Sequence, residues 1–134
     1  KLNLKLAGGI DDVWINKDTN KLIMADYKAQ SKASNKKIEG YLEDVYHGVA
    51  TKVTVCVENE SLFKGMDKEI EVGRYHSWVV NPNLPDSLEA TSFDTNGQVM
   101  SLRHKVYDVK GVQYHPESVL TPNGKQILKN WINS

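Results

Sequence analysis

The sequence predicts an α/β fold of the α+β kind, with a mixed, mostly antiparallel sheet, a helix near 34–46 and a C-terminal helix near 122–132. Most of the chain alternates apolar and polar residues in short runs separated by turn residues, which is typical of strands. Two segments instead place apolar residues at helical spacing. A length of 134 residues suits one modest core, so we expect a single compact domain.

The first 28 residues predict a β-hairpin. Residues 2 to 15 alternate in polarity, with a bend expected at Gly8 and Gly9. The sequence KDTN at 17–20 predicts a turn, and residues 21–27 form the returning strand. A polar, lysine-rich stretch follows, with lysines at 28, 32, 36 and 37. It leads into the expected helix, whose apolar residues are Ile38, Tyr41, Leu42 and Val45.

The second half of the chain is rich in predicted strands. Val53, Val55 and Val57 alternate with polar neighbours, and four further strands are expected in EVGRYHSWVV (71–80), LEATSF (88–93), QVMSLRH (98–104) and VKGVQY (109–114). Turns are expected at NPNLPD and DTNG. Thr121 and Pro122 predict the N-cap and first turn of the closing helix, whose apolar stripe is Ile127, Leu128, Trp131 and Ile132.

Composition narrows the classes of function. Lysine plus arginine and aspartate plus glutamate both number 17, so no overall field attracts nucleic acid or an anionic membrane. Cys56 is the only cysteine, which excludes an internal disulfide and fits a reducing cytoplasm, where we expect the protein. No run approaches the roughly 18 apolar residues of a membrane span.

The sequence GVQYHPES contains the first candidate site. In an extended segment, residues two apart share a face, so His115 and Glu117 point the same way while Pro116 prevents a helix. A carboxylate beside an imidazole fixes its tautomer and stabilises its protonated form. This pair therefore indicates a general base for nucleophilic catalysis, although a surface histidine beside a solvated glutamate has the same pattern.

Residues 47–134 resemble the C-terminal part of class I glutamine amidotransferases, in particular anthranilate synthase component II of tryptophan biosynthesis. The motifs LFKGM, GRYHSWVVN, SLRHK and GVQYHPESVLTPNGKQILKNW carry this resemblance. It implies glutamine hydrolysis, with His115 as general base and acid and Glu117 as its orienting partner. It also implies a glutamine-contacting strand containing His76 and Ser77, and a component I-like synthase subunit that receives the ammonia.

The nucleophile of that family is missing from these residues. The family carries its cysteine in a G-x-C-x-G elbow, where backbone N–H groups stabilise the oxyanion. Cys56 lies instead in TVCVE, between valines, and we expect it to be an inert, packed thiol. We therefore expect little or no binding or hydrolysis of glutamine by this chain alone.

The hairpin contains the second candidate site. Asp11 lies on one expected strand, and Asp26 and Lys28 share a face of the next. Two carboxylates can hold Mg²⁺, and a neighbouring lysine can position the attacking water of phosphodiester hydrolysis. Acidic strand ends beside a solvated lysine would give the same pattern.

Residues 4–32 resemble the core hairpin of the PD-(D/E)XK nucleases, in their RecB-like branch. The pattern is GGID, a turn, and a hydrophobic run that ends in DYK. The resemblance implies that Asp11 and Asp26 are metal ligands and that Lys28 is catalytic. The lysines that follow could meet a phosphate backbone. The acidic residue on a preceding helix and the glutamine/tyrosine motif of that branch are not matched.

Three interpretations remain open. The chain is an amidotransferase-like protein that retains the histidine and glutamate of the site, a metal-dependent nuclease or nucleic-acid-binding protein that uses the hairpin, or a chimera of two family fragments with neither activity. The boundary falls at 46/47, and we expect 1–46 and 47–134 to share one sheet and one core. Apolar surface left uncovered would favour a homo-oligomer.

Overall fold

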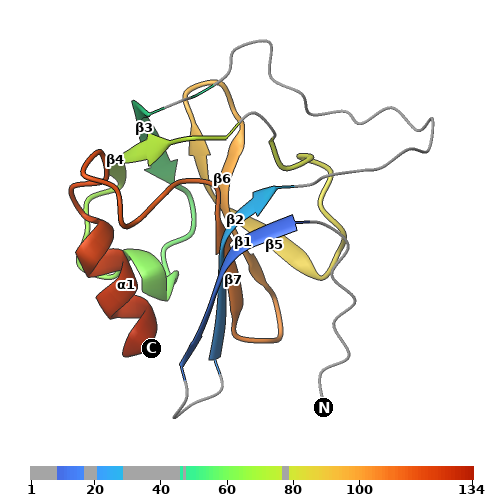
Figure 1. Cartoon of the computed structure of the whole chain (residues 1–134). Helices are drawn as coiled ribbons and strands as arrows, with labels where there is room; N and C mark the ends of the chain where they lie inside the picture. The colour runs from blue at the N-terminus through green and yellow to red at the C-terminus, as the bar shows by residue number, and fades with distance from the viewer. Residues whose placement is uncertain (1–8, 17–20, 29–45, 47, 77–78) are drawn as a thin grey trace.

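Seven strands form one mixed sheet in the computed structural model, which describes residues 9–16, 21–28, 46, 48–76 and 79–134 (Figure 1). The strands are β1 (Gly9–Asn16), β2 (Lys21–Lys28), β3 (Val49–Val55), β4 (Glu69–Arg74), β5 (Leu88–Asp94), β6 (Val99–His104) and β7 (Val109–Val112). The described residues also form a short 3-10 helix, η1 (Ser61–Phe63), and the C-terminal helix α1 (Gly124–Ile132). Of the expected helix near 34–46, residues 34–45 lie outside the described residues, and Tyr46 is described without helical structure.

The strand order is β1-β2-β7-β6-β5-β3-β4. Every neighbouring pair is antiparallel except β2 and β7, which are parallel. The predicted hairpin is confirmed, and it joins the rest of the sheet through the pairing of Leu22 with Val109. The prediction of one mixed, mostly antiparallel sheet is therefore confirmed.

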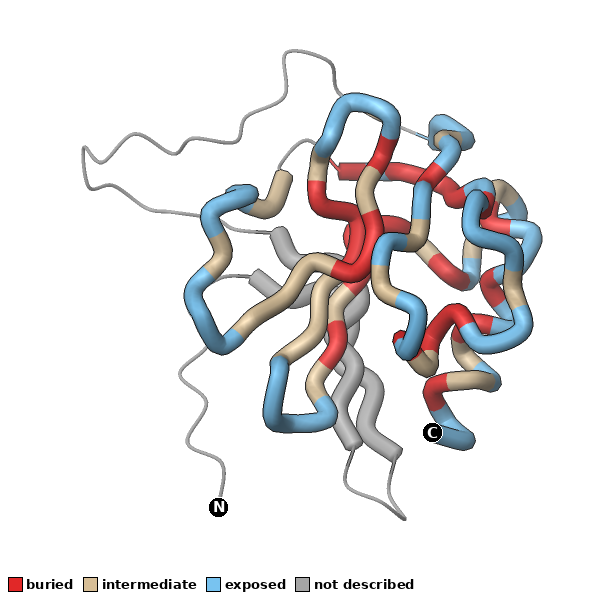
Figure 2. Tube along the Cα trace, turned by 180° about the vertical axis from the view of Figure 1, so that it is seen from behind, coloured by how far each residue is buried: buried red, intermediate tan, exposed pale blue. Residues whose placement is uncertain are grey.

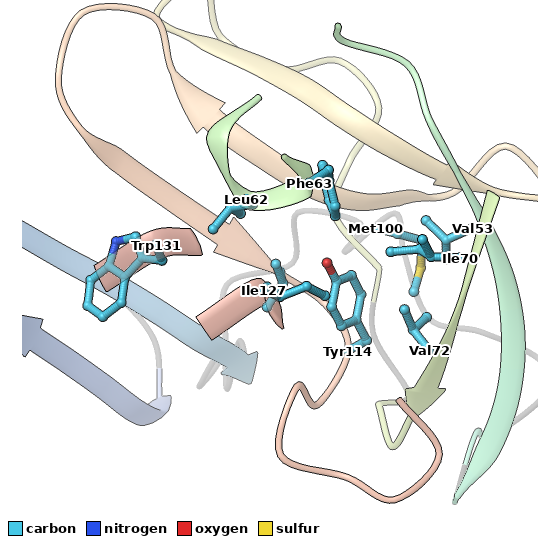
Figure 3. Packing of buried hydrophobic residues seen from close by; sticks show 10 residues of the cluster. Val53, Leu62, Phe63, Ile70, Val72, Met100, Tyr114, Ile127 and Trp131 are labelled. Atoms are coloured by element: carbon cyan, nitrogen blue, oxygen red, sulfur yellow. The ribbon is translucent and has the colours of Figure 1, made fainter. Parts of the chain in front are cut away.

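The hydrophobic core lies between the sheet and a cover made of η1 and α1 (Figure 3). Its members come from non-adjacent parts of the chain and are Val53, Leu62, Phe63, Ile70, Val72, Met100, Val112, Tyr114, Ile127 and Trp131. Buried segments gather in the middle of the molecule in Figure 2, whereas the connecting turns are exposed. Burial of these side chains is the main force that holds α1 against the sheet.

The closing helix begins later than the sequence predicts. Asn123, not Thr121, precedes the first helical residue, and its side chain makes no capping hydrogen bond. The hydroxyl of Thr121 instead bonds to backbone groups of Gly73 and His115, so tertiary partners replace the predicted cap. The predicted apolar stripe of this helix is only partly buried: Ile132 remains 53% exposed.

Two other predictions about strands need correction. The strand expected over residues 71–80 ends at Arg74, and Val80 makes only an isolated bridge to Val99. Cys56 lies just after β3 and is exposed, so the expectation of a packed thiol is wrong. The alternation itself is correct: Val53 is buried and Thr54 is exposed, which places Cys56 on the outer side with Thr54.

The turn DTNG is confirmed as the connection between β5 and β6. Asp94 accepts backbone hydrogen bonds from Asn96 and Gln98 through its Oδ1 atom, at 2.9 and 2.8 Å. Gly97 has a φ of +77°, in the left-handed region that glycine adopts most easily.

No helix of the described residues is long and apolar enough to cross a membrane.

Candidate functional site

The candidate site forms where the end of β4 meets the segment that follows β7. The amide of His115 donates to the carbonyl of Gly73, with an N···O distance of 3.0 Å. Strands β6, β5 and β3 separate β4 from β7 in the sheet order, so this bond shows that the sheet curls. Curling brings GRYH and YHPES, about 40 residues apart in sequence, to one place.

His115 and Glu117 form the hydrogen-bonded pair that their spacing predicts. The distance from His115 Nδ1 to Glu117 Oε1 is 2.7 Å, and the side chains are 23% and 55% exposed. A proton on Nδ1 satisfies this bond and makes Nε2 the basic nitrogen of the neutral ring. The arrangement is that of an oriented base, and its catalytic role stays a prediction.

Tyr75 and Ser118 adjoin this pair and were not singled out in the sequence. The ring of Tyr75 meets the imidazole of His115 at an angle of 69°, with 4.9 Å between centroids. The hydroxyls of Tyr75 and Ser118 are 3.0 Å apart. With Glu117 and Val119 these residues line a shallow hollow of about 370 Å³. The hollow thus lies beside the imidazole of His115, whose Nε2 atom is itself buried.

Two glycines allow the site segments to pack closely. A side chain at Gly73 would place its Cβ atom 2.8 Å from Leu120 Cβ. At Gly124, the first residue of α1, a Cβ atom would lie 1.7 Å from the carbonyl oxygen of Pro116. The segment that follows His115 is thus fitted against both glycines without room for a methyl group on either of them.

His76 is part of a buried polar cluster centred on Arg74. Both residues are buried, and Arg74 Nε donates to His76 Nε2 at 3.2 Å, which requires that nitrogen to carry no proton. The guanidinium also bonds to Asp94 Oδ2 at 2.7 Å and to Gln98 Oε1 at 2.6 Å. The ring of Tyr46 lies over it, 3.8 Å from the guanidinium carbon to the ring centroid.

This cluster bears on the predicted glutamine contact at His76 and Ser77. One ring nitrogen of His76 is already held by Arg74, so the imidazole helps to anchor the strand end next to the site. Ser77 lies outside the described residues. Whether either residue touches glutamine stays a prediction. Sequence reasoning missed Arg74, although a charged residue between alternating strand residues could have indicated a buried ion pair.

Cys56 does not have the surroundings of an activated nucleophile. Its Sγ atom lies 3.5 Å from the carbonyl oxygen of Ala90. Partial burial raises the pKa of this thiol, although the residue is exposed. Reactive cysteines have a lowered pKa instead. The expectation that Cys56 is inert is therefore consistent with its environment, even though its predicted packing was wrong.

The hairpin residues are described by their backbone alone. The register pairs Ile10 with Tyr27 and Asp12 with Ala25, so Asp11 and Asp26 occupy facing positions on neighbouring strands. Lys28 pairs with Gly9 at the end of β2. Their side chains lie outside the described part of the structure. Among the side chains that are described, no group of three or more histidine, cysteine, aspartate or glutamate residues could hold a metal ion.

Residues 23–134 match the sequence profile described as "Glutamine amidotransferase class-I". The chain therefore belongs to the class I glutamine amidotransferase family. The match begins inside β2, and thus upstream of residue 47, where we expected the amidotransferase part to start. It also includes Asp26 and Lys28, two of the three residues of the proposed nuclease-like site.

Several relatives of the chain are biosynthetic proteins. The chain is 39% identical over 90 residues to aminodeoxychorismate synthase component 2 of Klebsiella aerogenes, covering 66% of this chain and 47% of that protein. It is 43% identical over 91 residues to the bifunctional protein TrpGD of Thermotoga maritima, covering 66% of this chain and 15% of that protein. The chain thus spans about half the length of the Klebsiella relative and less of the bifunctional Thermotoga protein.

A solved structure supports the fold. A protein of Thermoplasma acidophilum described as a subunit of GMP synthase superposes with a TM-score of 0.61 at 31% sequence identity. The match covers 69% of this chain and 45% of that one. The arrangement of about two thirds of this chain is therefore also found in a solved structure.

Proposed function

We propose that this chain supplies the general-base part of a glutamine amidotransferase site. The observation that carries the proposal is the 2.7 Å bond between His115 Nδ1 and Glu117 Oε1, beside a hollow and at the junction of β4 with the segment after β7. A carboxylate that holds the proton on Nδ1 leaves Nε2 to act as the base and stabilises the imidazolium that forms.

The reaction needs a thiol from outside these 134 residues. They contain no G-x-C-x-G elbow, and Cys56 has a raised pKa. His115 would take the proton of that thiol as its sulfur attacks the side-chain amide carbon of glutamine. The imidazolium would then give the proton to the departing nitrogen, releasing ammonia and leaving a γ-glutamyl thioester.

The second half of the reaction uses the same base. His115 would take a proton from water as the water oxygen attacks the thioester carbon, and the thiol would leave as glutamate forms. The names of the relatives, which include component 2 of a synthase and tryptophan biosynthesis proteins, support transfer of the ammonia to a component I-like synthase subunit. We expect this partner to be needed for a biosynthetic product.

Hydrolysis of a preformed thioester tests the base without a nucleophile in the chain. The substrate is the γ-thioester of glutamate with ethanethiol, and release of the thiol is followed with a thiol-reactive dye. We expect the native chain to hydrolyse it about 100-fold faster than His115→Gln, the lower end of the usual contribution of a general base. Glu117→Gln should fall between them, and glutamine itself should release no ammonia.

His104→Gln is the matched control, because His104 lies in another part of the sheet, at the end of β6. Its Nδ1 atom accepts from the amides of Val106 and Tyr107, both at 3.0 Å. This variant should keep the native rate. Equal rates for the native chain and His115→Gln would overturn the proposal.

A divalent-metal site in the hairpin is the second candidate, favoured by the facing backbone positions of Asp11 and Asp26. Their carboxylates would hold Mg²⁺, and Lys28 would serve hydrolysis of a nucleic acid backbone. Calorimetric titration of Mg²⁺ or Mn²⁺ should show micromolar binding that Asp11→Ala/Asp26→Ala abolishes. Absence of binding to the native chain would remove this candidate. A chain that failed both tests would match the interpretation of two family fragments with no activity.

A further inference from the structure

The hydroxyl of Thr121 connects the two segments that form the site. It accepts a hydrogen bond from the amide of Gly73, with an N···O distance of 2.9 Å. It also donates to the carbonyl oxygen of His115 at 2.7 Å. Thr121 is only 4% exposed, so water cannot readily replace either bond.

These bonds close a ring between β4 and the segment of His115. The amide of His115 donates directly to the carbonyl of Gly73, while the amide of Gly73 reaches the carbonyl of His115 through Thr121. The backbone N–H and C=O groups of His115 are therefore both connected to β4, the N–H directly and the C=O through Thr121. The amide of Ser118 adds a second donor to the His115 carbonyl, at 3.1 Å.

The backbone around this ring has little room to adjust. Gly73 packs against Leu120 and Ser118, and Gly124 packs against the carbonyl of Pro116, so none of these segments can shift far without a clash. The carbonyl of Thr121 accepts from the amide of Gly124, which ties the same residue to the start of α1. The Thr121 hydroxyl, which both donates and accepts, thus acts together with the amides of His115 and Ser118 in holding the His115 backbone.

We propose that Thr121 is a positioning residue that aligns His115 with Glu117. Glu117 is 55% exposed and its carboxylate has solvent as an alternative partner, so the side-chain bond between the two depends on where the backbone places the imidazole. Loss of the hydroxyl leaves the Gly73 amide and one lone pair of the His115 carbonyl without their partner. The His115 peptide then rotates slightly within its packed surroundings, and a shift of this size weakens the alignment of Nδ1 with Glu117.

The test compares Thr121→Val with Thr121→Ser in the whole chain. Valine keeps the shape and removes the hydroxyl, while serine keeps the hydroxyl. Long-range ¹⁵N–¹H correlation spectra of His115 report the ratio of the Nδ1–H to the Nε2–H tautomer, which a purely structural role would not change. We expect Thr121→Val to lower that ratio by about 3- to 10-fold, the range that corresponds to one hydrogen bond. Thr121→Ser should retain the native ratio.

Thr121→Val with a native tautomer ratio would overturn the proposal, even if the variant were less stable. Should this variant not fold, amide hydrogen exchange of the native protein decides. The Gly73 amide must then be protected as strongly as the His115 amide, and much faster exchange at Gly73 would overturn the proposal.

This inference rests on the proposed function, but the two fail separately. An altered tautomer ratio in Thr121→Val, with no thioester hydrolysis by the native chain, would refute only the proposed function. Hydrolysis that depends on His115 and is unchanged in Thr121→Val would refute only the role of Thr121.

Discussion

Asp94→Asn tests whether the buried ion pair holds the strand end next to the site. Arg74 and Asp94 form a 2.7 Å salt bridge in which both side chains are 0% exposed. The two carboxylate oxygens have different tasks: Oδ2 accepts from Arg74, while Oδ1 accepts from the amides of Asn96 and Gln98. An asparagine amide has one oxygen and one NH₂ group, so it cannot serve both sets of donors.

The expected loss follows from this geometry. Removing one partner of a buried ion pair costs about 3–5 kcal/mol, because a charge is left without compensation in the interior. The lower end applies here, since Gln98, His76 and the ring of Tyr46 still contact the guanidinium. A loss of about 3 kcal/mol, with a urea slope of about 1–3 kcal/mol per molar, lowers the unfolding midpoint by about 1–3 M.

Urea unfolding followed by tryptophan fluorescence measures this shift. Glu69→Gln is the matched control, because Lys52 and Glu69 form a salt bridge of the same 2.7 Å length with side chains 64% and 56% exposed. We expect little change there, since solvent screens exposed pairs. A midpoint shift for Asp94→Asn no larger than that of Glu69→Gln would refute the reasoning. Arg74→Met combined with Asp94→Asn should cost less than the sum of the single changes.

Further predictions concern three single positions: Tyr114, Cys56 and Gly124. Tyr114 is fully buried, and its hydroxyl has no hydrogen-bond partner among the described residues, so Tyr114→Phe should raise the free energy of unfolding by about 1 kcal/mol. Burial, with the nearby charge of Glu60, also raises the pKa of Tyr114. The folded state therefore keeps a proton that the unfolded state loses above pH about 10, so the free energy of unfolding should fall as the pH rises there. Denaturant melts at pH 8 and 10.5 should show a smaller fall for Tyr114→Phe than for the native chain. An equal fall in both would contradict this reasoning. Partial burial raises the pKa of Cys56, so iodoacetamide should alkylate it more slowly at pH 7.5 than it alkylates a cysteine peptide. A faster reaction of Cys56, measured by mass spectrometry, would contradict that expectation. Gly124→Ala should lower the free energy of unfolding by about 1–3 kcal/mol, because the added Cβ atom meets Pro116. Lys125→Ala, at an exposed position, should change it by less than about 0.5 kcal/mol. Equal effects of the two substitutions in thermal melts would show that the start of the helix can shift freely.

Local pattern was sufficient for much of the fold. The alternation of Val53, Val55 and Val57 predicts a strand, and Val53 and Val55 lie in β3 with Val53 buried. The DTNG turn needs only four neighbouring residues, and its Gly97 has the expected left-handed backbone. Likewise, the pairing of His115 with Glu117 depends on residues two apart in an extended segment, so their spacing alone indicates it.

Long-range pairing was not predictable in this way. The partners of Arg74 include Asp94, 20 residues away, and the Gly73 amide binds Thr121, 48 residues away. At Thr121 the local signal was misleading, because a threonine before a proline predicts a helix cap. The folded chain offers its hydroxyl a backbone amide and carbonyl in a dry interior, where unpaired polar groups are costly, and these partners prevail over the cap.

The sequence by itself determined most of the strands, the DTNG turn and the chemical identity of the His115–Glu117 pair, because these depend on residues that are neighbours along the chain. Only the tertiary structure decided that the sheet curls and joins Gly73 to His115, and that Arg74, Thr121 and Tyr75 surround the site. The physical reason is that curling of the sheet and burial of its core set which distant groups meet, and no short stretch of sequence contains that information.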